Sequence, residues 1–340
     1  MRYVYISVPG DNKIAIFIMD SDSGKLTHQA DFQCESSGPL ALHPSQPVLY
    51  AALRGDPPQL GSLGIDPATG GLSALGSTPL KEGPAMISAD RKGGFLMGAY
   101  YGGGAVSVHP INGEGVVGDP PAVEWLETAP RAHYIEADAD NRIVLVPHVM
   151  PGNAVFQFRF DEDSGQLTPI EPHFQAEDGE GPRHICFHPN QRFVYSANEN
   201  GSTVTAYSFD AAKGTLAALQ TVSTLPPEGY VPGEENNSCA QIRIAPNGKF
   251  LYAPNRGHNS VACFRIDESG LLATIGYAPI ERHTRGTAMD PGGKFLYTTG
   301  VRSGRLASFS ISQQTGALEP LENFELGQGP MWVEIYTPGQ

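Results

Sequence analysis

Three arginines, one histidine and one carboxylate each hold one of two equivalent places in neighbouring copies of a repeated segment. They are Arg183, Arg256, Arg285, His133 and Glu199. A guanidinium presents a planar fork of N–H donors that fits two oxygens of a phosphate or carboxylate. Neighbouring arginines also keep a carboxylate ionised, which suits Glu199 to the role of a general base and not a general acid. The set predicts a site that holds an anionic molecule and moves a proton.

Four further residues are candidates for binding the substrate. Arg54 and Tyr101 occupy the same kind of place in other copies of the segment, and His184 and Gln241 are sequence neighbours of such places. For any single arginine at a strand end, a solvated ion pair is about as probable as a functional role. The equivalent places elsewhere hold Leu, Ala, Val and Met, which favours a functional set. We expect no metal and no cofactor. His184 and His188 are four residues apart on one strand, a distance of ~13 Å, which is too far for them to share one ion.

The elements that must position these residues are indicated by a repeated glycine. Seven times a glycine is followed, usually two residues later, by leucine or valine, and successive glycines are 46, 45, 50, 49, 56 and 46 residues apart. They are Gly24, Gly70, Gly115, Gly165, Gly214, Gly270 and Gly316. A period in this range is typical of an array of identical supersecondary units.

Each unit reads as four short antiparallel strands. In one clear copy, segments rich in β-branched and aromatic residues span 181–189, 192–199, 203–209 and 216–222, each bounded by Pro, Gly, Asn or Ser. The chain begins on a second strand, 3–5, and ends on a first strand, 329–335, so one end completes the unit that the other leaves short. A ring closed in this way has no long bare sheet edges at the chain ends.

We therefore predict an all-β fold, a seven-bladed β-propeller with four-stranded antiparallel blades, whose first blade is completed by the C-terminal strand. One domain would span 1–340. A β-solenoid is the alternative, but it needs atypical capping repeats at its ends, and the sequence contains none. In a propeller blade the start of the first strand and the end of the second lie at one edge of the sheet, so the candidate residues would share one mouth of the ring.

Composition limits the partners. The formal net charge is −14, and no Lys/Arg stretch offsets it, which argues against nucleic acid and acidic membrane surfaces. The four cysteines have no CxxC spacing, so we expect reduced, mostly buried thiols. The N-terminal residues do not resemble a signal segment, and no apolar run approaches the length of a membrane span. We expect a cytoplasmic monomer that acts on a small molecule.

Several motifs resemble those of one enzyme family. These are Gly-Pro-Arg-His at 181–184, Asn-Glu at 198–199, Asn-Arg at 255–256 and Gly-Gln-Gly-Pro-Met-Trp at 327–332. Over essentially the whole chain the sequence resembles the propeller-type 6-phosphogluconolactonases, a family that also includes fungal carboxymuconate cyclases. The resemblance implies a seven-bladed propeller and a lactonase of carbohydrate metabolism, in the pentose phosphate pathway. It also implies functional roles for His133, Arg183, Glu199 and Arg256.

If the resemblance holds, the substrate is a small anionic lactone, most simply 6-phosphoglucono-1,5-lactone. Glu199 or His133 would activate water, Arg183 or Arg256 would stabilise the oxyanion, and Arg285 or Arg54 would hold the anionic tail. Two alternatives stay open: a carboxymuconate cyclase or other lactone isomerase on the same fold, and a non-catalytic propeller that binds proteins on its rim. Under the hydrolase reading with Glu199 as base, Glu199→Gln would lower kcat by roughly 10²–10⁴-fold.

Overall fold

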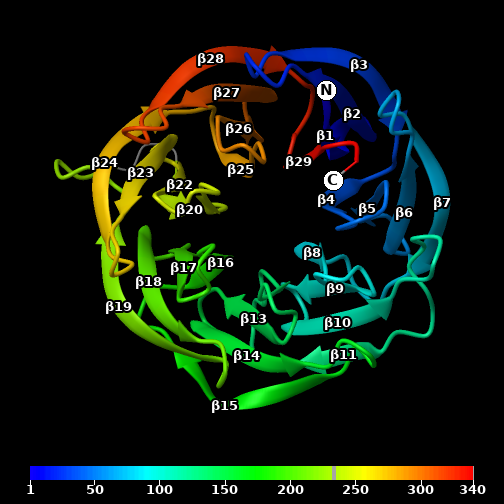
Figure 1. Cartoon of the computed structure of the whole chain (residues 1–340), viewed down its shortest axis with the longest axis horizontal. Coiled ribbons are helices and arrows are strands. Elements are labelled where there is room, and N and C mark those ends of the chain that lie inside the picture. The colour runs from blue at the N-terminus through cyan, green and yellow to red at the C-terminus, as the bar shows by residue number, and fades with distance from the viewer. Residues whose placement is uncertain (232–234, 340) are drawn as a thin grey trace.

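Seven antiparallel sheets follow one another around a ring in the computed structural model, which describes residues 1–231 and 235–339 (Figure 1). This arrangement confirms the predicted seven-bladed β-propeller. The strands nearest the axis are β4 (Ser37–Leu42), β8 (Met86–Ala89), β12 (Glu136–Ala137), β16 (Pro182–Phe187), β20 (Ser238–Cys239) with β21 (Arg243–Ile244), β25 (Thr284–Met289) and β29 (Trp332–Tyr336).

The second strand of each blade runs antiparallel to the first. These strands are β1 (Arg2–Val8), β5 (Val48–Leu53), β9 (Phe95–Tyr100), β13 (Ile143–His148), β17 (Phe193–Asn198), β22 (Phe250–Arg256) and β26 (Phe295–Gly300). Their side chains are almost entirely buried on both faces, because each second strand is packed between the neighbouring blades.

The third and fourth strands lead outwards to solvent. The third strands are β2 (Lys13–Met19), β6 (Gln59–Ile65), β10 (Ala105–Pro110), β14 (Ala154–Phe160), β18 (Thr203–Asp210), β23 (Ser260–Ile266) and β27 (Arg305–Ile311). The fourth are β3 (Leu26–Gln33), β7 (Leu72–Pro79), β11 (Val123–Glu127), β15 (Leu167–Gln175), β19 (Thr215–Ser223), β24 (Leu272–Pro279) and β28 (Leu318–Glu325). The fourth strands are mostly exposed, so the core lies between the inner halves of the blades.

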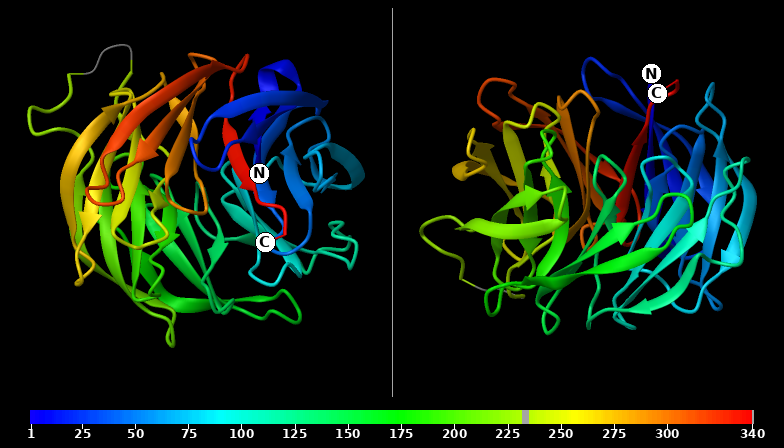
Figure 2. Two further views of the ribbon diagram at one scale, coloured as in Figure 1. Left: turned by 45° about the horizontal axis from the view of Figure 1, so that its top comes forward. Right: turned by 60° about the horizontal axis from the view of Figure 1, so that its bottom comes forward.

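The two chain ends meet in the first blade, as predicted. β29 pairs with β1 over Ser7↔Trp332 to Tyr3↔Tyr336, and Figure 1 shows the two strands side by side. The two oblique views of the ribbon also place the ends of the chain together (Figure 2). The pairing covers the edge that β1 would otherwise leave bare.

Two physical constraints require glycine at the repeated position. Each of the seven adopts a positive φ, a conformation that costs a residue with a Cβ about 1–2 kcal/mol. Each also lies against the second strand of the preceding blade. At Gly270, for example, an added Cβ would lie 2.5 Å from the Phe193 ring. At Gly24 the neighbour is Phe295 of the last blade, so the same contact closes the ring.

Tyrosines reinforce five of the seven blade junctions. The hydroxyls of Tyr5, Tyr50, Tyr195, Tyr252 and Tyr297 donate to the carbonyls of Gly70, Gly115, Gly270, Gly316 and Gly24, at 2.7–3.1 Å. Met97 and Leu145 hold this place in the third and fourth blades. The fourth blade is therefore joined to both neighbours without this hydrogen bond.

Two inner strands are shorter than the repeat predicts. The peptides of Pro147 in β13 and Pro254 in β22 accept hydrogen bonds from His133 N (3.0 Å) and Ala240 N (2.9 Å). Proline has no N–H group to donate to the inner strand, so the backbone hydrogen bonds between the inner and second strands are interrupted there. As a result the fourth blade keeps only β12, and in the sixth blade the inner strand is divided into β20 and β21.

The described residues include one helical segment, the three-residue 3₁₀ turn η1 (Pro9–Asp11). In this part of the chain no helix has the length and apolar character needed to cross a bilayer. All four cysteines are buried and unbridged, as expected.

Candidate active site

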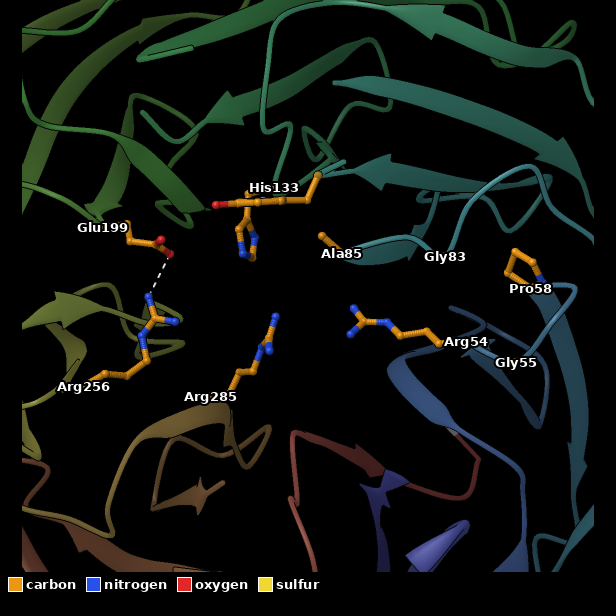
Figure 3. Close-up of a pocket in the computed structure, with 10 residues that line it drawn as sticks. Arg54, Gly55, Pro58, Gly83, Ala85, His133, Glu199, Arg256 and Arg285 are labelled. Carbon is orange, nitrogen blue, oxygen red and sulfur yellow. Dashed lines mark hydrogen bonds and ion pairs between the residues drawn. The ribbon is translucent and has the colours of Figure 1, made fainter. Parts of the chain in front are cut away.

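A cavity of about 500 Å³ lies at one end of the ring axis, which we call the near mouth. It is formed where inner strands begin and second strands end. Its ten lining residues are Arg54, Gly55, Pro58, Gly83, Ala85, Tyr101, His133, Glu199, Arg256 and Arg285. Six of the nine predicted site residues are among them, and Figure 3 shows the side chains of five, all except Tyr101, gathered around one space.

Strand ends place these side chains. Arg54, Tyr101 and Glu199 each directly follow a second strand, and Arg256 ends β22. Arg285 belongs to an inner strand with a β-bulge, because the pairing of β25 shifts register between Thr284 and Thr287. A bulge re-aims the side chain it contains. Residues from distant segments therefore meet at one mouth, as the positions of the strand ends in the sequence predicted.

Glu199 is held by two arginines through one oxygen. Arg183 Nε and Arg256 Nη2 both donate to Glu199 Oε2 at 2.7 Å. Burial alone would raise the pKa of Glu199, but the two guanidiniums outweigh it and lower that pKa below its usual value. Glu199 is therefore a firmly ionised carboxylate.

Arg183 and Arg256 differ in depth. Arg183 is 1% exposed and does not line the cavity, whereas Arg256 does. Arg256 Nη2 also donates to the Cys239 carbonyl at 2.9 Å, which fixes the guanidinium against the cavity wall. Of the two arginines considered for the oxyanion, Arg256 is the one that faces the space where a substrate would lie.

His133 is a neutral imidazole in a cationic setting. It is 4% exposed, and its Nδ1 has no hydrogen-bond partner among the described residues. Burial, followed by the charges of Arg183, Arg285 and Arg256, lowers the pKa of His133 well below its usual value. The edge of its ring contacts Tyr101, with centroids 5.7 Å apart. An uncharged nitrogen base thus lies beside Glu199 and Arg256.

Arg54 and Arg285 are cations without an acidic partner in the described part of the chain. Arg54 Nη2 donates to the Pro84 carbonyl at 2.9 Å, and Arg285 has no hydrogen bond or ion pair there. Burial and the charge of Arg285 lower the pKa of Arg54 to about 10, which leaves Arg54 charged at neutral pH. Figure 3 shows both guanidiniums directed into the cavity. With Arg183, Arg256 and Glu199, they make this mouth strongly positive in a chain of net charge −14.

His184 and Gln241 lie below the near mouth and do not line it. His184 is packed between His133 and Tyr134, with ring centroids 5.2 and 4.6 Å away. Gln241 Oε1 accepts from Thr287 N at 2.7 Å and from Arg243 Nη2 at 3.2 Å. Their roles as substrate contacts stay predictions.

Gly55, Pro58 and Gly83 line the cavity but were not among the predicted site residues. Gly83 has a packing role, since an added Cβ would lie 3.2 Å from Arg54 Cγ. Gly55 and Pro58 belong to the segment Arg54-Gly-Asp-Pro-Pro, which departs from the pattern of the resembled family, whereas no sequence signal indicated Gly83. The described residues contain no group of three or more His, Cys, Asp or Glu side chains placed to hold a metal ion.

Comparison with known proteins agrees with this geometry. Residues 5–335 match the family described as "Lactonase, 7-bladed beta-propeller". The chain belongs to this lactonase family, which confirms the family resemblance.

Two relatives extend over nearly the full length. The 6-phosphogluconolactonase of Pectobacterium carotovorum is 34% identical over 339 residues, which cover 98% of each chain. That of Serratia proteamaculans is 33% identical over 344 residues, with the same coverage. Among solved structures, the periplasmic gluconolactonase PpgL of Pseudomonas aeruginosa has a TM-score of 0.89 over 99% of each chain. Its sequence is 22% identical, so this likeness concerns the fold alone.

Proposed function

We propose that this lactonase hydrolyses 6-phosphoglucono-1,5-lactone to 6-phosphogluconate at the near mouth. The observation that carries the proposal is the pair of guanidiniums, Arg54 and Arg285, which have no acidic partner among the described residues and lie beside a neutral His133 and the Arg256–Glu199 pair. A phosphate dianion suits two arginine forks, and a lactone carbonyl suits a base and a cation close together. The names of the full-length relatives point to the same substrate.

The reaction uses His133 as the base in this proposal. Its Nε2 takes a proton from water while the water oxygen attacks the lactone carbonyl carbon. Arg256 stabilises the oxyanion, whose collapse breaks the ring C–O bond. The imidazolium then returns its proton to the leaving ring oxygen. Glu199 acts through the arginines it holds, because its Oε2 already accepts from two of them.

Substrate binding would itself strengthen this base. The charge of Arg285 contributes to the lowered pKa of His133 in the free protein. A phosphate dianion on Arg54 and Arg285 offsets that charge, so the pKa of His133 rises when the substrate is bound. The imidazole becomes a better proton acceptor when there is water to activate.

A panel of lactones tests the substrate. Acid release in a pH-stat is expected with 6-phosphoglucono-1,5-lactone, and kcat/KM should fall roughly 10²-fold or more with unphosphorylated glucono-1,5-lactone. Replacing both Arg54 and Arg285 by Gln should remove that preference. Failure to release acid from the phosphorylated lactone above its spontaneous rate would overturn the proposal. Turnover of carboxymuconolactone without acid release would instead identify the cyclase or isomerase alternative.

We also propose that the chain works as a monomer in the cytoplasm. Its four unbridged, buried cysteines agree with a reducing compartment. Sedimentation of the purified protein and fractionation of the cells that produce it test the two statements separately.

A further inference from the structure

A second hollow, of about 420 Å³, lies at the opposite end of the ring axis, which we call the far mouth. It is formed where the inner strands end and turn into the second strands, so it is on the other face from the lactonase cavity. Leu40 and Met86 line one side of it, and Arg243, Trp332 and Glu334 line another. The two cavities share no lining residue.

Arg243 is the least satisfied charge in this hollow. Its Nη1 donates to the Ile242 carbonyl and its Nη2 to Gln241 Oε1, both at 3.2 Å, so both acceptors are neutral. No carboxylate pairs with it among the residues described. A guanidinium lining a concave surface without a counter-ion is a site for an anion.

The other charges at the far mouth are already neutralised. Arg91 Nη2 donates to Glu136 Oε1 at 2.9 Å, and the Tyr134 hydroxyl donates to Glu136 Oε2 at 3.1 Å. Asp290 pairs with Arg2 at 2.8 Å. The charge of Arg243 is therefore not cancelled by these groups.

Glu334 repels an anion less strongly than a fully ionised carboxylate would. Its Oε1 accepts from Trp332 Nε1 at 2.9 Å, and burial raises the pKa of Glu334 to about 7, against the charge of Arg243. This carboxyl therefore accepts a proton more readily than an ordinary glutamate, and its protonated form offers a donor.

The rest of the hollow is apolar. Leu40, Met86 and Ile87 are buried aliphatic side chains from the second and third blades, and Trp332 presents an aromatic ring. A ligand that satisfies both sides has one anionic end and an apolar body.

We propose that the far mouth is a second binding site, for a small monocarboxylate with an aromatic or apolar body. The carboxylate receives N–H donors from Arg243, and the body packs against Trp332 and Met86. The site is separate from the lactonase reaction and does not depend on the substrate proposed for it.

The two tryptophans of the chain allow a direct test. Trp125 lies at the outer end of the third blade, where its ring contacts Tyr100, and Trp332 lies in the far mouth. Trp125→Phe leaves Trp332 as the single indole reporter. Titration of this variant with benzoate is expected to change the emission saturably, whereas benzamide, the neutral isostere, should not. No saturable change with benzoate, or equal binding of benzamide, would overturn the proposal without any substitution at the site.

Substitutions in the same background locate the site. Arg243→Gln should weaken benzoate binding at least about tenfold, and Arg243→Lys should weaken it less, because a charge remains without the planar fork. The matched control is Arg265→Gln on the exposed face of β23 in the same blade, which should leave binding unchanged. Unaltered binding in Arg243→Gln contradicts the site. Binding that is lost in Arg54→Gln/Arg285→Gln but kept in Arg243→Gln assigns the anion to the near mouth and also contradicts it.

Discussion

Glu199 and His133 are both candidates for the base, and the difference between their surroundings is the reason we propose His133. Glu199 Oε2 is occupied by two guanidiniums that stabilise the ionised form. His133 is neutral and faces the cavity without a partner on Nδ1 among the described residues. The arginines lower the pKa of both groups, but Glu199 Oε2 already accepts two hydrogen bonds, whereas the ring of His133 faces the cavity. The preference for His133 therefore rests on tertiary contacts, which cannot be read from the sequence.

A pair of substitutions tests this preference. His133→Gln should lower kcat by roughly 10²–10⁴-fold, the usual effect of losing a general base. Glu199→Gln should cost less, roughly 10- to 100-fold, through weaker charge-assisted hydrogen bonds to Arg256 and Arg183. Steady-state kinetics measure both, with circular dichroism to show that the folds are intact. A larger loss in Glu199→Gln than in His133→Gln would make Glu199 the base.

The pH dependence carries a second prediction. His133 must be neutral to accept a proton, so kcat/KM rises with pH through the pKa of His133 in the free enzyme and is level above it. Arg285 helps to lower that pKa, and Arg285→Gln should therefore raise it. The acidic limb of kcat/KM is expected to move to higher pH in Arg285→Gln and to stay in place in the exposed control Arg265→Gln. A limb that stays in place or moves to lower pH would show that His133 is not the titrating group.

At the scale of the blade, the repeated glycine joins one element to the next. Gly270 combines a φ of +81° with a close approach to Phe193, and the Tyr195 hydroxyl donates to its carbonyl at 3.1 Å. The repeat, with glycines 45 to 56 residues apart, was visible in the sequence because backbone conformation and packing both exclude a side chain at this position.

Gly270→Ala should therefore destabilise the protein by roughly 2–4 kcal/mol, since it adds both backbone strain and an overlap with a buried ring. Thermal and denaturant unfolding measure the change. Gly113→Ala is the matched control, because Gly113 has no atom within 4 Å of an added Cβ and no positive φ. Similar stability in the two variants would remove the packing explanation for the repeat.

At the scale of the whole molecule, closure depends on the pairing of β29 with β1. The strand brings Trp332 and Val333 into the core and supplies the innermost strand of the first blade. Without it, β1 would present an unpaired edge along the axis.

A chain ending at Gln328 should lose cooperative unfolding and aggregate, because the ring cannot close. A chain ending at Thr337 keeps β29 and should behave like the full protein. Soluble yield and circular dichroism melts compare them. Cooperative unfolding of the shorter chain near the normal temperature would show that closure by β29 is dispensable.

Periodicity in the sequence was enough to predict the ring, the shared first blade and the mouth at which the candidate residues meet. Seven of the ten cavity residues occupy strand starts or ends that the repeat aligns: Arg54, Ala85, Tyr101, His133, Glu199, Arg256 and Arg285. Strand ends at one edge of a sheet are neighbours in any propeller, so local pattern determines this much.

The depth at which each site side chain lies, and its charge state, could be determined only from the tertiary structure. Arg183 and Arg285 start the inner strands of their blades and both strands shift register there, yet Arg183 is buried outside the cavity while Arg285 lines it. His184 lies below the mouth, packed against His133 and Tyr134, and Arg243, which has no acidic partner among the described residues, follows no motif. Bulges, burial and the sum of charges around a side chain depend on contacts between distant blades, which the order of residues does not display.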